Sequence, residues 1–251
     1  MHIRLATIAD APYAAEVSFA AYWNNELYCW LYPQRDKYPS DLIESLRIRN
    51  KIGFLSPGVV STVAVTDEND GLGDPGRIIG FAVWRRFGSD PEAQKWMHDR
   101  LDRYLLSWEK WYQDNFLDYA TDWKRVAYFR SVISKVVFYK TLDDYWLLNS
   151  LAVHPQAQRR GIGSRLLEWG MQTAERESVP VVLESAPPAR ALYERAGLKV
   201  FEEIEVEGIE PGYAMLWEPD RIKGTWLTMD DKGNTVLRGQ KLKAQEREEK
   251  M

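Results

Sequence analysis

A short, basic, glycine-rich run has the residue types that bind phosphate groups. Residues 158–164 read Gln-Arg-Arg-Gly-Ile-Gly-Ser, and a helical pattern follows at once. Gly161 and Gly163 allow the backbone to turn sharply and to approach a ligand closely. The N-terminus of a helix carries about half a positive charge and presents free N–H groups, so it binds anions. Arg159 and Arg160 add charged donors. The run therefore predicts a cradle for a pyrophosphate.

Other phosphate and metal sites do not match the sequence. There is no lysine at the P-loop position after a GxxxxG, and the glycines form a GxG rather than the three-glycine dinucleotide fingerprint. The three histidines and the single cysteine, Cys29, are not spaced as metal ligands. No metal is therefore expected.

Regular elements on both sides must position this run. Residues 145–153 are an apolar stretch of strand length, ended by Pro155. Residues 181–183 read as a second buried strand, and residues 187–196 as a second helix that a proline can open. The order is strand, loop, helix, strand, helix. The first helix shows an apolar face at helical spacing, made of Leu166, Leu167, Gly170, Met171 and Ala174.

This stretch resembles a known family. The sequence LAVHPQAQRRGIGSRLL is similar to the acetyl-CoA motif of the GNAT acetyltransferase superfamily, whose loop reads Gln/Arg-x-x-Gly-x-Gly/Ala. ALYERAGLKV resembles the helix and strand that follow it there. A looser similarity extends over most of residues 1–218. The resemblance implies an α/β (α+β) fold with a central, mixed, largely antiparallel sheet of six or seven strands, flanked by helices.

The resemblance also implies an activity. Family members move the acetyl group of acetyl-CoA directly to an amine, here of a small molecule or a peptide, without a covalent enzyme intermediate. Two alternatives remain, a non-catalytic acyl-CoA-binding module and an enzyme that uses a longer acyl-CoA. The residues implied in cofactor binding are Leu151, Ala152, Val153, Gln158, Arg159, Arg160, Gly161, Ile162, Gly163 and Ser164.

Individual roles follow from the same resemblance. The strand carrying Leu151 to Val153 resembles the splayed, bulged family strand whose backbone pairs with the pantetheine arm and offers an N–H to the acetyl oxygen. These residues also suit an ordinary core strand. Tyr193 occupies the place of the family tyrosine that protonates the departing sulfur, and a phenol with a pKa of about 10 is protonated at neutral pH. The alternative is a packing tyrosine.

No general base is evident. Positions near Leu147 or Asn149, where some relatives carry a base, hold residues that cannot accept a proton near neutral pH. Glu184 is one alternative, and Asp143 or Asp144 is another. A chain of water molecules would serve equally well.

The rest of the chain suggests one domain with additions. Residues 1–220 form the predicted GNAT domain, and residues 221–251 an extension with a polar tail from about residue 238. Residues 88–143 are predicted to be a helical insertion, although residues 131–140 suit helix or strand equally. Within it, residues 96–116 are expected to form a helix that borders the acceptor site. That helix would line the site or form a dimer contact; the alternative is a buried helix that enlarges the core.

Composition limits the partners. The 251 residues carry a net charge of −4, which argues against a nucleic-acid partner, and no apolar run has the length of a membrane span. The N-terminus lacks a signal-peptide pattern. We therefore expect a cytoplasmic protein, a monomer or homodimer, that has an amine acceptor as its partner and no membrane association.

Overall fold

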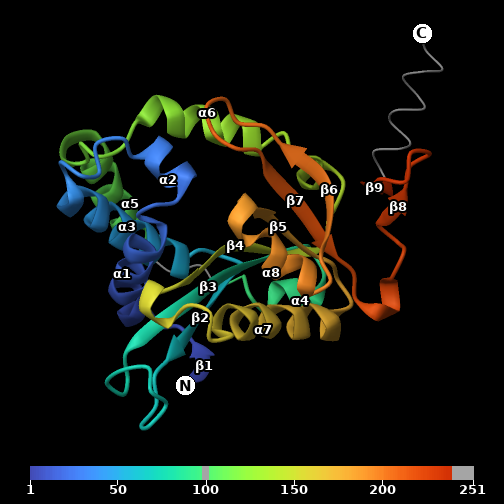
Figure 1. Ribbon diagram of the computed structural model, residues 1–251, viewed down its shortest axis with the longest axis horizontal. Helices are drawn as coiled ribbons and strands as arrows, with labels where there is room; N and C mark the ends of the chain where they lie inside the picture. The colour runs from blue at the N-terminus through green and yellow to red at the C-terminus, as the bar shows by residue number, and fades with distance from the viewer. Residues whose placement is uncertain (98–101, 239–251) are drawn as a thin grey trace.

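A seven-stranded sheet forms the centre of the molecule. The computed structural model describes residues 1–97 and 102–238 (Figure 1). The spatial order of the strands is β1-β2-β3-β4-β5-β7-β6. Only β4 and β5 run parallel, which confirms the predicted mixed, largely antiparallel sheet. The strands are β1 (His2–Leu5), β2 (Val59–Val65), β3 (Ile78–Phe87), β4 (Tyr145–Val153), β5 (Val181–Ser185), β6 (Lys199–Ile204) and β7 (Gly212–Trp217).

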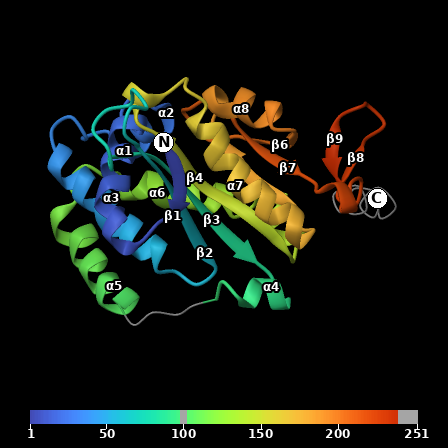
Figure 2. The same ribbon diagram turned by 90° about the horizontal axis from the view of Figure 1, so that it is seen from below.

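Helices cover both faces of this sheet. On one face lie α7 (Ile162–Glu177) and α8 (Arg190–Arg195), with α7 crossing the central strands (Figure 2). The other face is covered by α1 (Ala11–Tyr22), α3 (Pro39–Phe54) and α6 (Trp123–Ile133), as Figure 1 shows. The sheet therefore has a buried core on each side, and the predicted strand-loop-helix-strand-helix order is present from β4 to α8.

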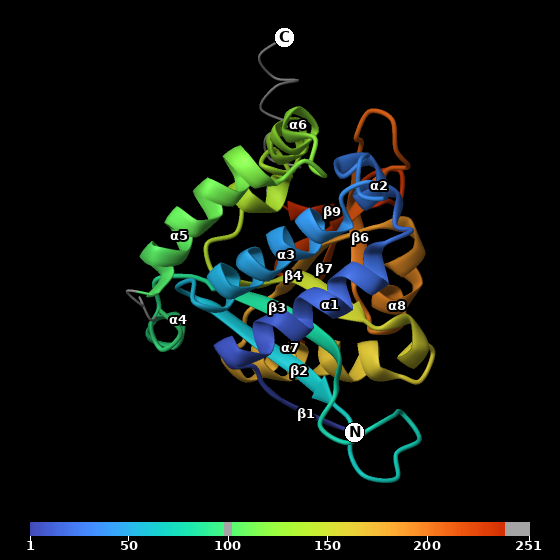
Figure 3. The same cartoon turned by 90° about the vertical axis from the view of Figure 1, so that its left-hand side faces the viewer.

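The long connection between β3 and β4 is helical. It holds α4 (Pro91–Gln94), α5 (Asp102–Tyr112), a π-helical turn (Gln113–Leu117), α6 and a 3-10 turn, η3 (Val137–Lys140). The ambiguous residues 131–140 thus end α6 and form η3, without a strand. The predicted helix over residues 96–116 includes residues 98–101, which lie outside the described residues; Trp96 and Met97 are not helical. In Figure 3, α5 lies on the outer side of α3.

Short elements complete the chain. Strands β8 (Leu227–Met229) and β9 (Thr235–Leu237) form a separate antiparallel hairpin beyond β7. Helix α2 (Glu26–Leu31) follows α1. The remaining 3-10 turns are Ile8–Asp10, Pro155–Ala157, Pro187–Ala189 and Asp220–Ile222. Within the described residues, no helix combines the length and apolarity needed to cross a membrane.

Close packing between α7 and β3 fixes how near the helix lies to the sheet. Leu166, Leu167 and Ala174 of α7 are buried against the sheet together with Trp84 of β3. Gly170 belongs to the same face, and a Cβ atom there would overlap the indole ring of Trp84. Glycine is therefore required at this helical position by contact and not by backbone conformation.

We predict that Gly170→Ala lowers the free energy of unfolding by about 1–3 kcal/mol, because the added methyl group overpacks a dense core. Gly53→Ala is the matched control, since Gly53 is also helical and a Cβ there meets nothing within 4 Å. The control should be neutral or stabilising by up to about 1 kcal/mol. Urea unfolding of both variants measures the difference, and equal stabilities would contradict the packing argument.

Candidate active site

The parallel strands β4 and β5 separate part-way along their length. They pair only at Trp146–Val181, Leu147–Val182 and Leu148–Leu183. On its other side, β4 stays paired with β3 as far as Val153, but the register skips Asn149, which forms a bulge. A bulge bends its strand and re-aims the residues beside it. Beyond Leu148, β4 therefore has no strand partner on its β5 side in the part of the chain that the structure describes.

The glycine-rich loop follows the end of β4 and begins α7. Gly161 has φ 76° and is the residue before the first helical one, and Arg159 also has a left-handed φ of 63°. Within the described residues no side chain caps this helix, so its first N–H groups have no protein acceptor. A Cβ at Gly161 would meet nothing within 4 Å, so the loop faces open space. These features fit an anion such as a pyrophosphate.

The predicted loop side chains have different surroundings. Gln158 donates through Nε2 to the carbonyl of Val153 at 3.0 Å, and Arg160 donates to the carbonyl of Gly71 at 2.9 Å. Ile162 is 2% exposed in the core. Arg159, Gly161 and Ser164 are exposed, and Gly163 is half-buried. Gln158 thus ties the loop to the end of β4, and the buried side chain of Ile162 leaves only its backbone for a ligand contact.

A tyrosine from the first helix reaches the separated part of β4. The hydroxyl of Tyr22 donates to the carbonyl of Leu151 at 2.8 Å and lies 3.2 Å from Oγ of Ser150. Ala152 and Val153 are buried, so these predicted residues are also core strand. Sequence reasoning did not identify Tyr22, because one tyrosine at the start of an aromatic-rich segment carries no distinguishing signal.

Tyr193 lies on α8, on the same side of the sheet as α7. Its side chain is 7% exposed and belongs to the core between α7, α8 and the sheet. Burial raises the pKa of the Tyr193 phenol, and the nearby phenol of Tyr22 raises it further. Tyr193 is therefore protonated at neutral pH, as a proton donor must be. The two tyrosines come from helices on opposite faces of the sheet, and they are near enough for the phenol of Tyr22 to act electrostatically on that of Tyr193.

A cavity of about 400 Å³ opens beside the separated strands on the face opposite α7. One wall is the segment after α1, from Asn24 to Leu27, and α6 contributes Phe129 and Ile133. Asn149 of the bulge and Glu184 of β5 lie at its base. The remaining lining comes from the β5–α8 connection and the β6–β7 connection: Ser185, Ala186, Pro187, Pro188, Ile204, Val206, Ile209, Glu210 and Gly212.

The candidate bases differ sharply in position. Glu184 lines the cavity and accepts a hydrogen bond from the hydroxyl of Tyr139 at 2.8 Å; burial raises the pKa of its carboxyl. Asp144 precedes β4 at the opposite end of the strand, near Arg86 and Asp90, and the cavity lining includes neither it nor Asp143. Leu147 is buried. The structure therefore leaves Glu184 beside the cavity.

The structure tests only part of the prediction for the inserted helix. Trp108 and Trp111 of α5 are 73% and 52% exposed, so α5 is not a buried helix that enlarges the core. It does not line the cavity either, because α6 occupies that place. Helical periodicity identified α5 but could not tell which inserted helix would reach the strands. A dimer contact through α5 stays a prediction.

Comparisons with known proteins agree with this geometry. Residues 124–200 match the model of the "Acetyltransferase (GNAT) domain". A Stachybotrys chartarum protein called "Acetyltransferase" is 24% identical over 220 residues, covering 84% of this chain and 86% of that protein. A crystal structure from Corynebacterium glutamicum, described as histone acetyltransferase and related acetyltransferase, has a TM-score of 0.55 at 22% identity, covering 86% and 95% of the two chains. Over residues 124–200 the chain is thus similar to a GNAT acetyltransferase domain, and its fold is similar to that of an acetyltransferase structure.

A further structural neighbour shares the GNAT fold. It is the polyamine N-acetyltransferase of Drosophila melanogaster, with a TM-score of 0.50, 13% identity and coverage of 86% of this chain and 99% of that one. The family model spans α6 to the start of β6, including β4, the loop, α7 and Tyr193. The walls of the cavity at residues 24–27 and 204–212 lie outside it. The segment that matches the family model therefore supplies about half of the cavity lining, and the rest comes from outside it.

We predict that Gly161→Val weakens acetyl-CoA binding at least tenfold, about 1.4 kcal/mol, because a branched side chain at a positive φ distorts the loop and occupies the space beside its N–H groups. Gly233→Val is the control: Gly233 has φ 81° and open surroundings in the β8–β9 turn, so it carries similar strain away from the loop. Calorimetry measures both affinities. Unchanged binding by folded Gly161→Val would contradict the cradle.

Proposed function

We propose that this protein is an N-acetyltransferase that moves the acetyl group of acetyl-CoA directly to an amine of a small molecule or peptide. One observation carries the proposal: the separated part of β4 lies beside Gly163 in the first turn of α7, while Asn149 and Glu184, where the strands separate, line the cavity. A thioester held by the loop on one side can thus meet an amine from the cavity on the other. The GNAT family model and the relatives called acetyltransferases support the same reaction.

The chain's own groups have distinct parts in this proposal. The first N–H groups of α7, with Arg159 beside them, hold the pyrophosphate. The unpaired edge of β4 after Leu148 offers backbone partners to the extended arm, and an N–H there can stabilise the oxyanion. Tyr193 donates a proton to the departing sulfur. The bulge at Asn149 bends β4 away from β5, so that the opening between the two strands can be reached from both faces of the sheet.

The direct test mixes the purified protein with acetyl-CoA and a panel of amines and measures released thiol. Amine-dependent release, together with acetylated amine by mass spectrometry, is the expected result. Binding of acetyl-CoA without release for any amine would indicate a non-catalytic binding module. Faster turnover with a longer acyl-CoA than with acetyl-CoA would indicate that the longer acyl-CoA is the preferred donor.

We predict that Tyr193→Phe lowers turnover by on the order of 10²- to 10⁴-fold, as expected for loss of a general acid, while acetyl-CoA affinity changes little. The ring remains, so packing in the core is preserved. Steady-state kinetics with a good acceptor, alongside calorimetry with acetyl-CoA, separates the two effects. Turnover within about twofold of the wild type would leave Tyr193 with a packing role only.

A further inference from the structure

The cavity beside the separated strands is apolar and carries charge of one sign. Among the described residues, its charged lining residues are Glu26, Glu184 and Glu210, with no lysine, arginine or histidine. The backbone N–H of Glu210 donates to Oε1 of Glu26 at 3.2 Å, which joins two walls at the rim. The apolar lining includes Leu27, Phe129, Ile133, Ile204, Val206 and Ile209. Such a cavity favours a cation with an apolar body and disfavours a ligand that carries a carboxylate.

Glu184 occupies the point where the cavity meets the separated strands. Leu148 and Leu183 form the last pair of β4 and β5, so Asn149 and Glu184 are the next residue on each strand. Both line the cavity. The Tyr139 hydroxyl donates to Oε1 of Glu184, and one such bond leaves most of the acceptor capacity of a carboxylate free.

We propose that Glu184 accepts the proton of a cationic acceptor amine, and that this cavity selects amines that have an apolar body and lack a carboxylate. Tyr139 is a positioning residue that holds the carboxylate. This inference rests on the function proposed above and adds to it the acceptor class and the base.

The protons balance as follows. An ammonium group gives one proton to the Glu184 carboxylate and becomes a neutral amine, which is the form that can attack. The nitrogen then forms a bond to the carbonyl carbon while the carbon–sulfur bond breaks. The nitrogen releases its second proton to solvent, the sulfur gains a proton from Tyr193, and the Tyr193 phenolate takes a proton back from solvent. One proton is released overall when Glu184 returns to its ionised form.

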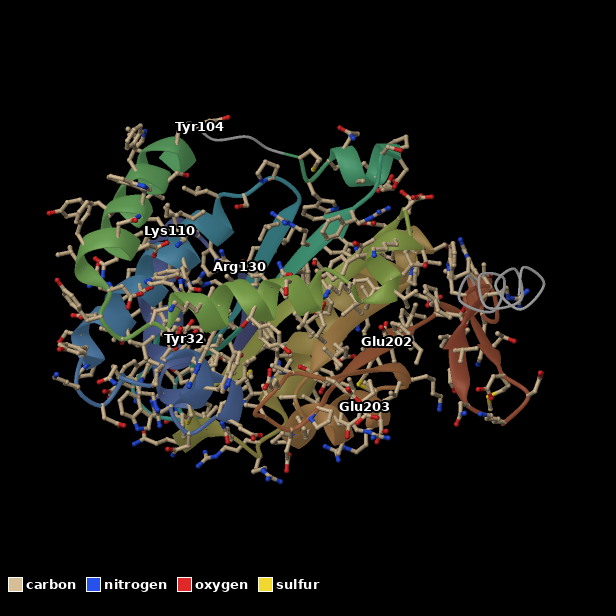
Figure 4. The ribbon with its side chains drawn as sticks, turned by 90° about the horizontal axis from the view of Figure 1, so that it is seen from above. Tyr32, Tyr104, Lys110, Arg130, Glu202 and Glu203 are labelled. Carbon is tan, nitrogen blue, oxygen red and sulfur yellow. The ribbon has the colours of Figure 1, made fainter. Side chains whose placement is uncertain are left out.

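Several groups around Glu184 affect its charge. Tyr139 of η3 bonds to it, Tyr145 of β4 interacts with it electrostatically, and Arg85 of β3 lies near both tyrosines. Helix α6 presents Phe129 and Ile133, and its Arg130 lines a neighbouring hollow with Tyr139; Figure 4 shows Arg130 on α6. Within the described residues no cation forms an ion pair with Glu184.

The pH dependence has a definite sign. Burial raises the pKa of Glu184, and the Tyr139 hydrogen bond opposes part of that rise. A base works only when ionised, so turnover should increase as the pH rises through this pKa. Removal of the Tyr139 hydroxyl removes the opposing contribution. The acid limb of the pH profile should therefore move to higher pH in Tyr139→Phe.

The experiment uses three variants of the full chain. Glu184→Gln keeps the shape and the acceptor for Tyr139 but cannot take the proton. Tyr139→Phe removes only the hydroxyl. Glu202→Gln is the matched control: Glu202 is a half-buried glutamate on β6 that accepts the N–H of Val137 at 2.9 Å and lies outside the cavity lining (Figure 4).

Three probes share one apolar body. Phenethylamine has an amine alone, phenylalaninamide adds a neutral group, and phenylalanine adds a carboxylate. We expect the wild type to acetylate phenethylamine and phenylalaninamide, with kcat/KM for phenylalanine at least tenfold lower than for either. Similar rates for phenylalanine and its amide would overturn the selection against a carboxylate.

Glu184→Gln should lower turnover of phenethylamine by on the order of 10²- to 10⁴-fold and abolish the acid limb, whereas Glu202→Gln stays within about twofold. Calorimetry should show weaker phenethylamine binding to Glu184→Gln with unchanged acetyl-CoA binding. A raised KM with the acid limb intact would reduce Glu184 to a binding group and overturn its role as base. If Glu184→Gln does not fold, Tyr139→Phe provides the test. An acid limb of its pH profile at the wild-type position would then overturn the role of Glu184 as base.

The proposed function can fail separately. If the wild type binds acetyl-CoA but releases no thiol with any amine, the acetyltransferase proposal fails. If the wild type is active and Glu184→Gln retains the wild-type pH profile and turnover, only the inference about Glu184 fails.

Discussion

The loss of pairing between β4 and β5 is the constraint on which the site depends. Parallel strands need regular, evenly spaced hydrogen bonds, and here these end at Leu148 and Leu183. The bulge at Asn149 keeps β4 paired to β3 while turning it away from β5. Backbone groups that would otherwise be used within the sheet become available to a ligand. Because the opening passes between two strands, it is accessible from both faces of the sheet.

The opposite end of the same strands is held together by buried charges. Arg86 of β3 is 3% exposed and donates to Glu177 at the end of α7 at 2.7 Å and to Asp90 at 2.6 Å. The indole N–H of Trp146 on β4 also donates to Glu177, at 3.0 Å. A buried cation with this many partners resists separation of the elements, because breaking a pair leaves an unpaired charge in the core. The strands can therefore separate at one end while α7, β3 and β4 stay joined at the other.

The two faces of the sheet carry different parts of the site. On one face, α7 presents its N–H groups and α8 presents Tyr193. On the other, α6 and the segment after α1 enclose the cavity that contains Glu184. Tyr22 connects the faces, because its hydroxyl satisfies the carbonyl of Leu151 at the edge that β5 leaves unpaired. A buried carbonyl without such a donor would be costly, so this tyrosine stabilises the separated arrangement.

Local signals in the sequence determined the strands and helices around the glycine-rich loop, and the resemblance to a known family added the arrangement of the sheet. Strand length, helical periodicity and a glycine that can adopt a positive φ are all visible in neighbouring residues. The elements β4, α7, β5 and α8 and the loop were therefore predictable. The cavity was not, because its walls come from residues 24–27, α6 and residues 204–212, which only the folded chain brings together. The same holds for Glu184: its raised pKa arises from burial beside Tyr139, 45 residues earlier. Periodicity likewise identified α5 but not its neighbours, since a helix pattern indicates which face is apolar and not what that face contacts.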